Sequence, residues 1–282
     1  MSIEAAGTID IKDLGPVTRL GFGAMRVTGP GVWGEPEDPA KARAVVEKSV
    51  ELGIDFIDTA DSYGPEVSER ILAEVLHPYP SGLRIGTKAG QARTGPGEWI
   101  PLGRAEYLRQ QVELSLRRLR TDSLDLFQLH RIDPKVDKDE QFSTMAEMQK
   151  EGLVQSLGLS EVSVEEIKEA EKYFTVATVQ NRYNLSDRKS EDVLDYCTEN
   201  NIAFIPWAPI DAGNLAKPGG PVDTAAERLG VTHSQVALAW LLQHSPMMLP
   251  IPGTSSAEHL AENVGAADVT LDQQAIEELN NV

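Results

Sequence analysis

Short apolar runs alternate along the chain with longer segments whose apolar residues recur every three or four positions. The short runs are typical of buried strands, and the longer segments are typical of helices that cover a sheet. The runs predict strands at 19–25, 54–58, 83–88, 124–130, 154–160, 177–180, 202–207 and 248–251. The periodic segments predict helices at 39–52, 68–76, 104–119, 140–151, 163–171, 192–200, 221–229, 234–243 and 256–265. Eight strands with helical connections and no interior linker predict an α/β fold, a closed (β/α)8 barrel that spans 1–282 as a single domain.

The alternating segment Thr8–Ile11 precedes the first predicted strand, and it predicts a short N-terminal β-hairpin across the bottom of the barrel. Local helix signals support the proposed limits. They are an N-cap before proline at Asp38-Pro39, a capping box from Ser163 to Glu166, and glycines after three helices at Gly53, Gly152 and Gly230.

Composition narrows the class of protein. The hydrophobic content of 41% is ordinary for a soluble domain, and the net charge of −18 argues against nucleic-acid or anionic-membrane partners. The first residues lack the basic and apolar regions of a signal peptide, and no apolar run is long enough to span a membrane. The single cysteine, Cys197, excludes an internal disulfide and is expected to be a small buried residue. We therefore expect a cytoplasmic protein, either a monomer or a weak homo-oligomer.

Polar residues follow three successive predicted strands. Asp58, Lys88 and His130 end the second, third and fourth of them, and Tyr63 lies five residues after Asp58. Taken singly, these residues have structural explanations: a helix cap, a solvated lysine, a core histidine or a loop tyrosine. In a (β/α)8 barrel, however, the carboxyl ends of the strands carry the catalytic groups, and these four meet there.

The four residues make chemical sense together. A free tyrosine has a pKa of ~10, and a buried ammonium from Lys88 is expected to lower it. Asp58 would keep Lys88 charged and oriented, and His130 would donate to a carbonyl oxygen or help to move the proton. Such a site protonates a carbonyl oxygen while hydride reaches the carbon. No side chain supplies hydride, so a nicotinamide cofactor is implied.

The segments Asp58-Thr59-Ala60, Tyr63-Gly64, Thr87-Lys88 and Leu129-His130 resemble the Asp-Tyr-Lys-His tetrad of the aldo-keto reductases. The resemblance covers nearly the whole chain and is strongest to the bacterial branch that includes pyridoxal reductases. It implies reversible NAD(P)H-dependent reduction of an aldehyde or ketone to an alcohol, with Tyr63 as proton donor and a pyridoxal-like or broad range of small carbonyl substrates.

The same resemblance implies a cofactor site. Ser160 and Gln180 would contact the nicotinamide carboxamide, and Trp207 would stack under the ring. The phosphates and adenine would lie near the segment that begins at Ile251. The remaining implied cofactor residues are Gly23, Met25, Ala208, Pro209, Ile210, Gly253, Thr254, Ser255, Ser256, His259, Glu262 and Asn263.

Two departures from the family pattern bear on the cofactor. Glu161 stands where the family usually has asparagine, which replaces an amide donor with an acceptor. Gly253 and His259 stand where many relatives place lysine and arginine for the 2′-phosphate. Hydroxyls and backbone N–H groups at the start of the following helix still suit a phosphate. NADPH is therefore the expected cofactor, with NADH as the alternative.

The sequence says least about the substrate. Trp33 and Trp99 lie in loops after the first and third strands and are expected to line the pocket. The loop 211–220, which contains Lys217, is a candidate cover for the pyrophosphate, and a short C-terminal tail suggests an open site. Two other functions stay as alternatives: a metal-dependent hydrolase or isomerase, although no convincing metal ligand set is present, and a non-catalytic or regulatory NADP-binding barrel.

Overall fold

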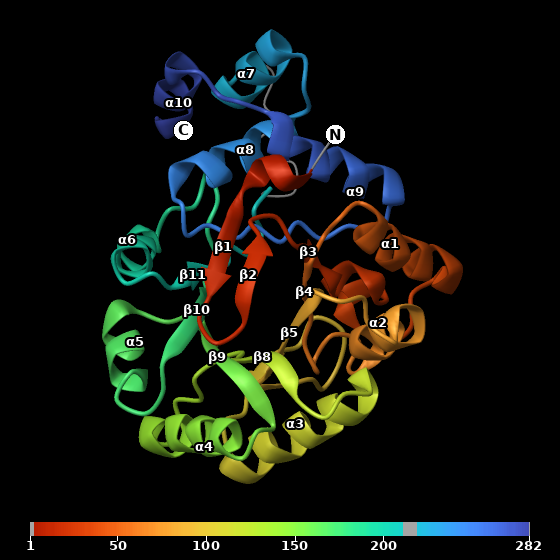
Figure 1. The fold of residues 1–282 in the computed structure, drawn as a ribbon, viewed down its shortest axis with the longest axis vertical. Helices are drawn as coiled ribbons and strands as arrows, with labels where there is room; N and C mark the ends of the chain where they lie inside the picture. Colours follow the sequence, from red (N-terminus) through yellow and green to blue (C-terminus); the bar gives the residue numbers. More distant parts are fainter. Residues whose placement is uncertain (1–2, 211–218, 282) are drawn as a thin grey trace.

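The computed structural model describes residues 3–210 and 219–281. Seven parallel strands form one curved sheet, and helices surround it (Figure 1). In spatial order the strands are β11 (Ala203–Phe204), β10 (Val176–Gln180), β9 (Val154–Ser160), β8 (Leu124–Leu129), β5 (Arg84–Ala89), β4 (Phe56–Asp58) and β3 (Phe22–Gly23).

The segment after α8 occupies the position of the eighth strand and closes the barrel. On one side the backbone N–H of Leu249 donates to the carbonyl of Phe204 at 2.8 Å. On the other side the N–H of Gly21 donates to the carbonyl of Pro250 at 2.9 Å. Pro250 and Pro252 have no N–H, so this segment cannot build a regular ladder. The expected strand at 248–251 is reduced to an isolated bridge between Phe204 and Met248 and to one bond from Gly21. The (β/α)8 barrel is confirmed.

The first predicted strand is shorter than expected. Pairing in β3 ends at Gly23, and Met25 lies in a 3-10 helix, η2 (Ala24–Val27), at the mouth of the barrel. Two elements in loops were not predicted: a second 3-10 helix, η3 (Pro30–Val32), and a two-stranded pair of β6 (Gln91–Ala92) with β7 (Ile100–Pro101) inside the long loop after β5.

All nine predicted helices are present, with limits within two residues of the expected ones. They are α1 (Pro39–Glu51), α2 (Val67–Leu76), α3 (Ala105–Leu119), α4 (Lys138–Lys150), α5 (Val164–Ala170), α6 (Glu191–Glu199), α7 (Pro221–Leu229), α8 (His233–His244) and α9 (Ala257–Val264). The Asp38 cap and the Ser163–Glu166 capping box both form, and Gly53, Gly152 and Gly230 adopt positive φ after their helices.

The C-terminal tail differs from the prediction because it contains a further helix, α10 (Gln273–Asn280). Arg188 donates to the carbonyls of Leu279 and Asn280 at 2.9 and 3.1 Å, and so binds the carboxyl end of this helix. Trp240 on α8 donates its indole N–H to the Asn280 side chain at 3.0 Å. The tail is thus held against the helices of the outer ring.

The predicted N-terminal hairpin is confirmed: β1 (Thr8–Ile11) pairs antiparallel with β2 (Gly15–Thr18). It crosses the barrel in Figure 1. Ile9, Ile11 and Val17 form a buried cluster with interior barrel residues that include Phe56 and Leu126. The hairpin therefore closes the amino-terminal end of the barrel, and the carboxyl ends of the strands are left for a site. Two 3-10 helices, η1 (Ile3–Ala6) and η5 (Gly265–Asp268), complete the described elements.

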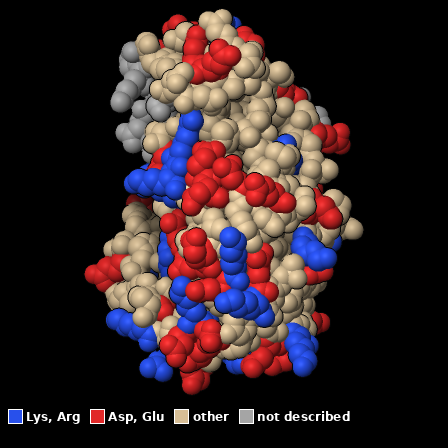
Figure 2. All heavy atoms as spheres, turned by 90° about the vertical axis from the view of Figure 1, so that its left-hand side faces the viewer, with Lys and Arg blue, Asp and Glu red and all other residues tan. Residues whose placement is uncertain are grey.

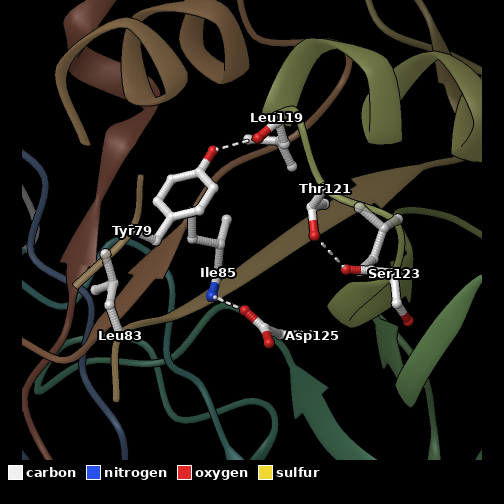
Figure 3. A pocket seen from close by; sticks show the side chains of 8 residues that line it. Tyr79, Leu83, Ile85, Leu119, Thr121, Ser123 and Asp125 are labelled. Atoms are coloured by element: carbon white, nitrogen blue, oxygen red, sulfur yellow. Dashed lines mark hydrogen bonds between the residues drawn. The ribbon is translucent and has the colours of Figure 1, made fainter. Parts of the chain in front are cut away.

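A small pocket lies near the amino-terminal ends of β5 and β8 (Figure 3). Tyr79 donates its hydroxyl to the carbonyl of Leu119 at 2.7 Å, and Asp125 accepts the backbone N–H of Ile85 at 2.9 Å. Because the strands are parallel, this pocket and the carboxyl ends of the same strands are at opposite ends of the barrel.

The surface is acidic but mixed. Figure 2 shows acidic side chains interspersed with lysines and arginines on the side that carries α4 to α6 in Figure 1. Lys138 of α4, for example, pairs with Glu166 and Glu169 of α5 at 3.3 and 2.9 Å.

Three other expectations concern single features. Cys197 is buried, and burial raises the pKa of its thiol to about 12, as expected for a structural cysteine. No helix of the described chain is both long and apolar enough to cross a bilayer. The loop 211–220 with Lys217, predicted to cover the pyrophosphate, lies outside the described residues except for Gly219 and Gly220.

Candidate active site

The four predicted catalytic residues converge at the carboxyl end of the barrel. Asp58 ends β4, Lys88 lies near the end of β5, and His130 directly follows β8. These strands are neighbours in the sheet, with Lys88 opposite Gln128 in the register of β5 and β8. Tyr63 comes from the loop after β4. The parallel arrangement thus brings together residues that are up to 72 positions apart in the sequence.

Lys88 is the centre of this group. Its side chain is fully buried, and its Nζ donates to Asp58 Oδ1 at 2.6 Å and to the carbonyl of Thr59 at 2.8 Å. The third contact of Nζ is the hydroxyl of Tyr63 at 3.5 Å. All three N–H bonds of the ammonium are therefore directed at oxygen atoms, and its positive charge faces the phenol.

Asp58 is held by amides as well as by the ammonium. Its Oδ2 accepts from the side chain of Gln180 at 2.8 Å and from that of Gln128 at 3.4 Å. Thr178 donates to the other end of the Gln128 amide at 3.1 Å and fixes its orientation. Gln128 and Thr178 were not predicted. Gln128 lies on β8, two residues before His130, a spacing that places both side chains on the same face of extended backbone.

Burial determines the net shift of the Tyr63 pKa. The pKa is raised above its usual value because burial disfavours the phenolate; Lys88 acts in the opposite direction, and Asp58 adds to the rise. The expectation of a lowered phenol pKa is therefore wrong for the protein alone. At neutral pH Tyr63 is a neutral phenol that carries a proton, with a cation placed to stabilise the anion formed when the proton leaves.

His130 is neutral at physiological pH. Its pKa lies well below the usual range, first because the ring is buried and then because Lys88, Arg131 and Arg93 disfavour a further positive charge. Its Nδ1 is 3.2 Å from the Ser62 hydroxyl, and its ring contacts that of Tyr63 edge-on at 5.9 Å. A neutral imidazole carries one N–H, so it can donate a hydrogen bond but adds no charge.

The depressed His130 pKa predicts acid sensitivity. Below pH ~6.5, His130 is protonated in the unfolded chain but stays neutral in the folded protein. Its contribution to the free energy of unfolding is therefore present above that pH and is lost as the pH falls below it. The free energy of unfolding should fall by up to about 1.4 kcal/mol per pH unit from this residue. Urea unfolding of the wild type and of His130→Asn between pH 7 and pH 5 measures the difference. Equal losses in both proteins would contradict a buried neutral His130.

Aromatic side chains line one side of the tyrosine. Trp99 lies edge-on to Tyr63 at 6.3 Å and to His130 at 6.1 Å. The Arg93 guanidinium stacks on Trp99 at 3.7 Å and lies 5.7 Å from the Trp33 ring. The two predicted wall residues are thus brought together through Arg93, which the sequence did not single out. Arg93 also donates to the carbonyls of Val32 and Ser62, both at 2.8 Å, and so ties three loops together.

The residues predicted to hold the nicotinamide end lie at the same rim. Ser160 ends β9, and its hydroxyl accepts from Arg131 at 3.0 Å. Gln180 ends β10 beside it, with Ser160 and Gln180 opposite each other in the register. Trp207 follows β11 and is half-buried, with its indole N–H bonded to Glu161 Oε1 at 2.6 Å. Arg131 was not predicted; it directly follows His130 and has no acidic partner within salt-bridge distance among the described residues.

The remaining predicted cofactor residues border this rim. Met25, Ala208 and Ile210 are half-buried, and Pro209 is buried. Gly23 and Gly253 are in such close contact that a Cβ on Gly253 would lie 2.8 Å from the Gly23 carbonyl oxygen. The segment after Gly253 leads into α9.

At the start of α9, Ser256 is the N-cap and accepts from the backbone N–H of His259 at 3.3 Å. Thr254 accepts the backbone N–H of Ser256 at 3.1 Å, whereas Ser255 and His259 are exposed. Glu262 and Asn263 lie further along the helix, the first half-buried and the second buried. In the described part of the chain, no group of three or more histidine, cysteine or acidic residues is arranged to hold a metal ion.

The sequence of residues 19–282 matches the model of the aldo/keto reductase family. The chain belongs to this family. It is 55% identical to an uncharacterized oxidoreductase of Schizosaccharomyces pombe over 98% of this chain and 89% of the relative. It is 38% identical to the pyridoxine 4-dehydrogenase of Escherichia coli over 94% and 95% of the two chains. This aldo/keto reductase is therefore an oxidoreductase.

A solved structure confirms the architecture. The glycerol dehydrogenase of Gluconobacter oxydans superposes with a TM-score of 0.89 over 98% of this chain and 95% of that one. The two sequences are 24% identical, so this likeness concerns the fold.

Proposed function

We propose that this aldo/keto reductase reduces an aldehyde or ketone with NADPH, and that Tyr63 is the proton donor. The observation that carries the proposal is the position of the Lys88 ammonium, 2.6 Å from the Asp58 carboxylate and 3.5 Å from the Tyr63 hydroxyl. A buried cation that is held in this way does not need a tyrosine beside it to be stable. Its charge is, however, where a phenolate would form during proton transfer.

Each residue then has a distinct role. The Tyr63 hydroxyl donates its proton to the carbonyl oxygen, and Lys88 stabilises the resulting phenolate. Asp58 keeps Lys88 charged and in place, with Gln180 and Gln128 holding the carboxylate. The neutral His130 donates an N–H to the carbonyl oxygen and orients it beside the phenol. In the reverse direction, the phenolate takes the proton from the alcohol.

When bound, NADPH supplies the hydride that the carbonyl carbon accepts. The residues at the rim suit this cofactor. Ser160 and Gln180 would hold the carboxamide, and Trp207 would face the nicotinamide ring. The hydroxyls of Thr254 and Ser255 and the amino-terminal end of α9 are donors of the kind that bind phosphate, and the family uses NADPH.

The alternative cofactor, NADH, has one supporting observation. Glu258 accepts the hydroxyl of Ser256 at 2.7 Å, which places a carboxylate at the start of α9. A carboxylate repels a 2′-phosphate but accepts from a ribose hydroxyl. NADPH and NADH therefore have to be compared directly.

We further propose a pyridoxal-like aromatic aldehyde as a substrate. Trp99 offers an aromatic surface beside Tyr63, and an aromatic ring in the substrate would pack against it. Trp33 lies on the far side of this group, next to Arg93. The 38% identity to a pyridoxine 4-dehydrogenase supports the same class.

A substrate screen tests this proposal. Purified protein would be assayed with pyridoxal, an activated aromatic aldehyde and an aliphatic ketone, each with NADPH and with NADH. We expect cofactor oxidation, with the aromatic aldehydes giving a higher kcat/KM than the aliphatic ketone and NADPH preferred to NADH. Turnover of the ketone alone would contradict the aromatic substrate class. Binding of NADPH without turnover of any carbonyl would favour a non-catalytic NADP-binding barrel.

A further inference from the structure

A single carboxylate links the ends of three neighbouring strands at the rim. Glu161 directly follows β9, Arg182 follows β10, and Trp207 follows β11. Glu161 Oε1 accepts the indole N–H of Trp207 at 2.6 Å and the backbone N–H of Arg182 at 2.6 Å. Both contacts have the short length of charge-assisted hydrogen bonds.

The backbone at Glu161 is unusual for its residue type. Its φ is 56°, in the left-handed region that glutamate seldom adopts. The N–H of Glu161 donates to the Gln180 carbonyl at 3.0 Å, which helps to hold this conformation. Ala208, the residue after Trp207, also has a positive φ of 53°. Strained backbone of this kind persists where surrounding contacts over-determine it, and it concentrates at functional sites.

These contacts define the plane of the Trp207 ring. The backbones of Trp207 and Arg182 form a parallel bridge, and the N–H of Trp207 donates to the Asn181 carbonyl at 3.1 Å. The Arg182 guanidinium lies 5.5 Å from the centre of the ring. A half-buried indole anchored only through its backbone could turn about its side-chain bonds. The bond from Nε1 to Glu161 removes that freedom.

We propose that Glu161 is a positioning residue, whose carboxylate holds the Trp207 indole in the orientation on which the nicotinamide ring stacks. The inference rests on the proposed function for the place of the nicotinamide. It gives Glu161 a role through Trp207 rather than through direct contact with the carboxamide. An indole fixed before binding loses less conformational freedom when the cofactor stacks, so affinity rises.

Indole N–H resonances test the contact in the cofactor-free protein. The signal of Trp207 is assigned by its loss in Trp207→Phe. We expect it to be shifted downfield and slow to exchange in the wild type, and to move to the position of a solvent-exposed indole in Glu161→Ala. Glu165→Ala, which removes an exposed carboxylate nearby in α5, is the matched control and should leave the signal unchanged.

Cofactor binding tests the role. We expect Glu161→Ala to raise the Kd for NADPH up to about tenfold, because cofactor binding must then order the freed Trp207 side chain. Glu161→Gln keeps an oxygen acceptor and should remain within about threefold of the wild type. In Trp207→Phe, adding Glu161→Ala should raise the Kd no further, because the two residues act as one unit. Melting temperatures of all variants show whether each is folded.

The possible results are separable. Normal NADPH binding by Glu161→Ala, or additive effects of the two substitutions, overturns the inference and leaves the proposed function intact. The two substitutions could instead have coupled effects on NADPH binding while no carbonyl compound is turned over. This result supports the role of Glu161 and contradicts the proposed function. A wild-type protein that binds neither NADPH nor NADH overturns both.

Discussion

Replacing Tyr63 with phenylalanine is expected to reduce kcat about 10²- to 10⁴-fold, the usual contribution of a positioned general acid. The substitution removes one hydroxyl and keeps the ring, which contacts Trp99 and His130 edge-on. The Kd for NADPH should stay near that of the wild type, because the Tyr63 hydroxyl contacts Lys88 and none of the predicted cofactor residues. Steady-state NADPH oxidation with an activated aromatic aldehyde measures the loss.

Tyr79 provides the matched control. It is also a largely buried tyrosine, and its hydroxyl is hydrogen-bonded to the carbonyl of Leu119 (Figure 3). It lies, however, near the amino-terminal ends of β5 and β8, at the opposite end of the barrel from Tyr63. Tyr79→Phe should therefore retain kcat and KM. If Tyr63→Phe kept near-wild-type turnover while remaining folded, Tyr63 would not be the proton donor.

Replacing Lys88 with methionine is expected to impair both stability and catalysis. The variant leaves Asp58 buried, with its amide donors but without a cation, and breaking a buried ion pair in this way costs about 3–5 kcal/mol. It also removes the charge that stabilises the Tyr63 phenolate, so kcat should fall at least as far as in Tyr63→Phe. Urea unfolding and the aldehyde assay measure the two effects separately.

A second variant separates the structural effect from the catalytic one. Combining Asp58→Asn with Lys88→Met removes both buried charges, so most of the lost stability should return. Activity should not return, because the tyrosine still lacks its cation. A double variant as unstable as Lys88→Met would show that the ion pair is not the source of the instability. A double variant with restored turnover would show that the ammonium is not needed for proton transfer.

The convergence of the proposed catalytic residues could be predicted because these residues share one local property. Asp58, Lys88 and His130 each lie at the carboxyl end of a strand, and a parallel barrel brings all such ends to one rim. The N-terminal hairpin was predictable for a similar reason, since alternation in Thr8–Ile11 gives one face that the barrel bottom buries. In both cases a short-range pattern and a known topology are sufficient.

Other features depend on contacts that no short-range pattern encodes. The direction of the Tyr63 pKa depends on the balance between burial and one cation, and the sequence shows the cation but not the burial. Gln128 and Thr178 matter because they bond to Asp58 and to each other across the barrel. Glu161 appeared only as a departure from the family pattern, and its bond to Trp207 joins residues 46 positions apart.

The limits of the shortest strands were mispredicted for a simpler reason. Apolar runs continue past the paired residues, but prolines remove the donors that a ladder needs. Pro206 follows closely on β11, and Pro250 and Pro252 interrupt the segment at the position of the eighth strand. Hydrophobicity thus located these strands, and backbone hydrogen bonding determined their lengths.

Transfer of deuterium from the cofactor to the product tests the proposed hydride transfer. The wild-type protein would be incubated with an aromatic aldehyde and with NADPH that carries deuterium at the transferable position of the nicotinamide, and the product would be analysed by mass spectrometry. We expect an alcohol with one deuterium on the former carbonyl carbon, formed much more slowly by Tyr63→Phe. An alcohol without deuterium, or no alcohol despite bound NADPH, would contradict it.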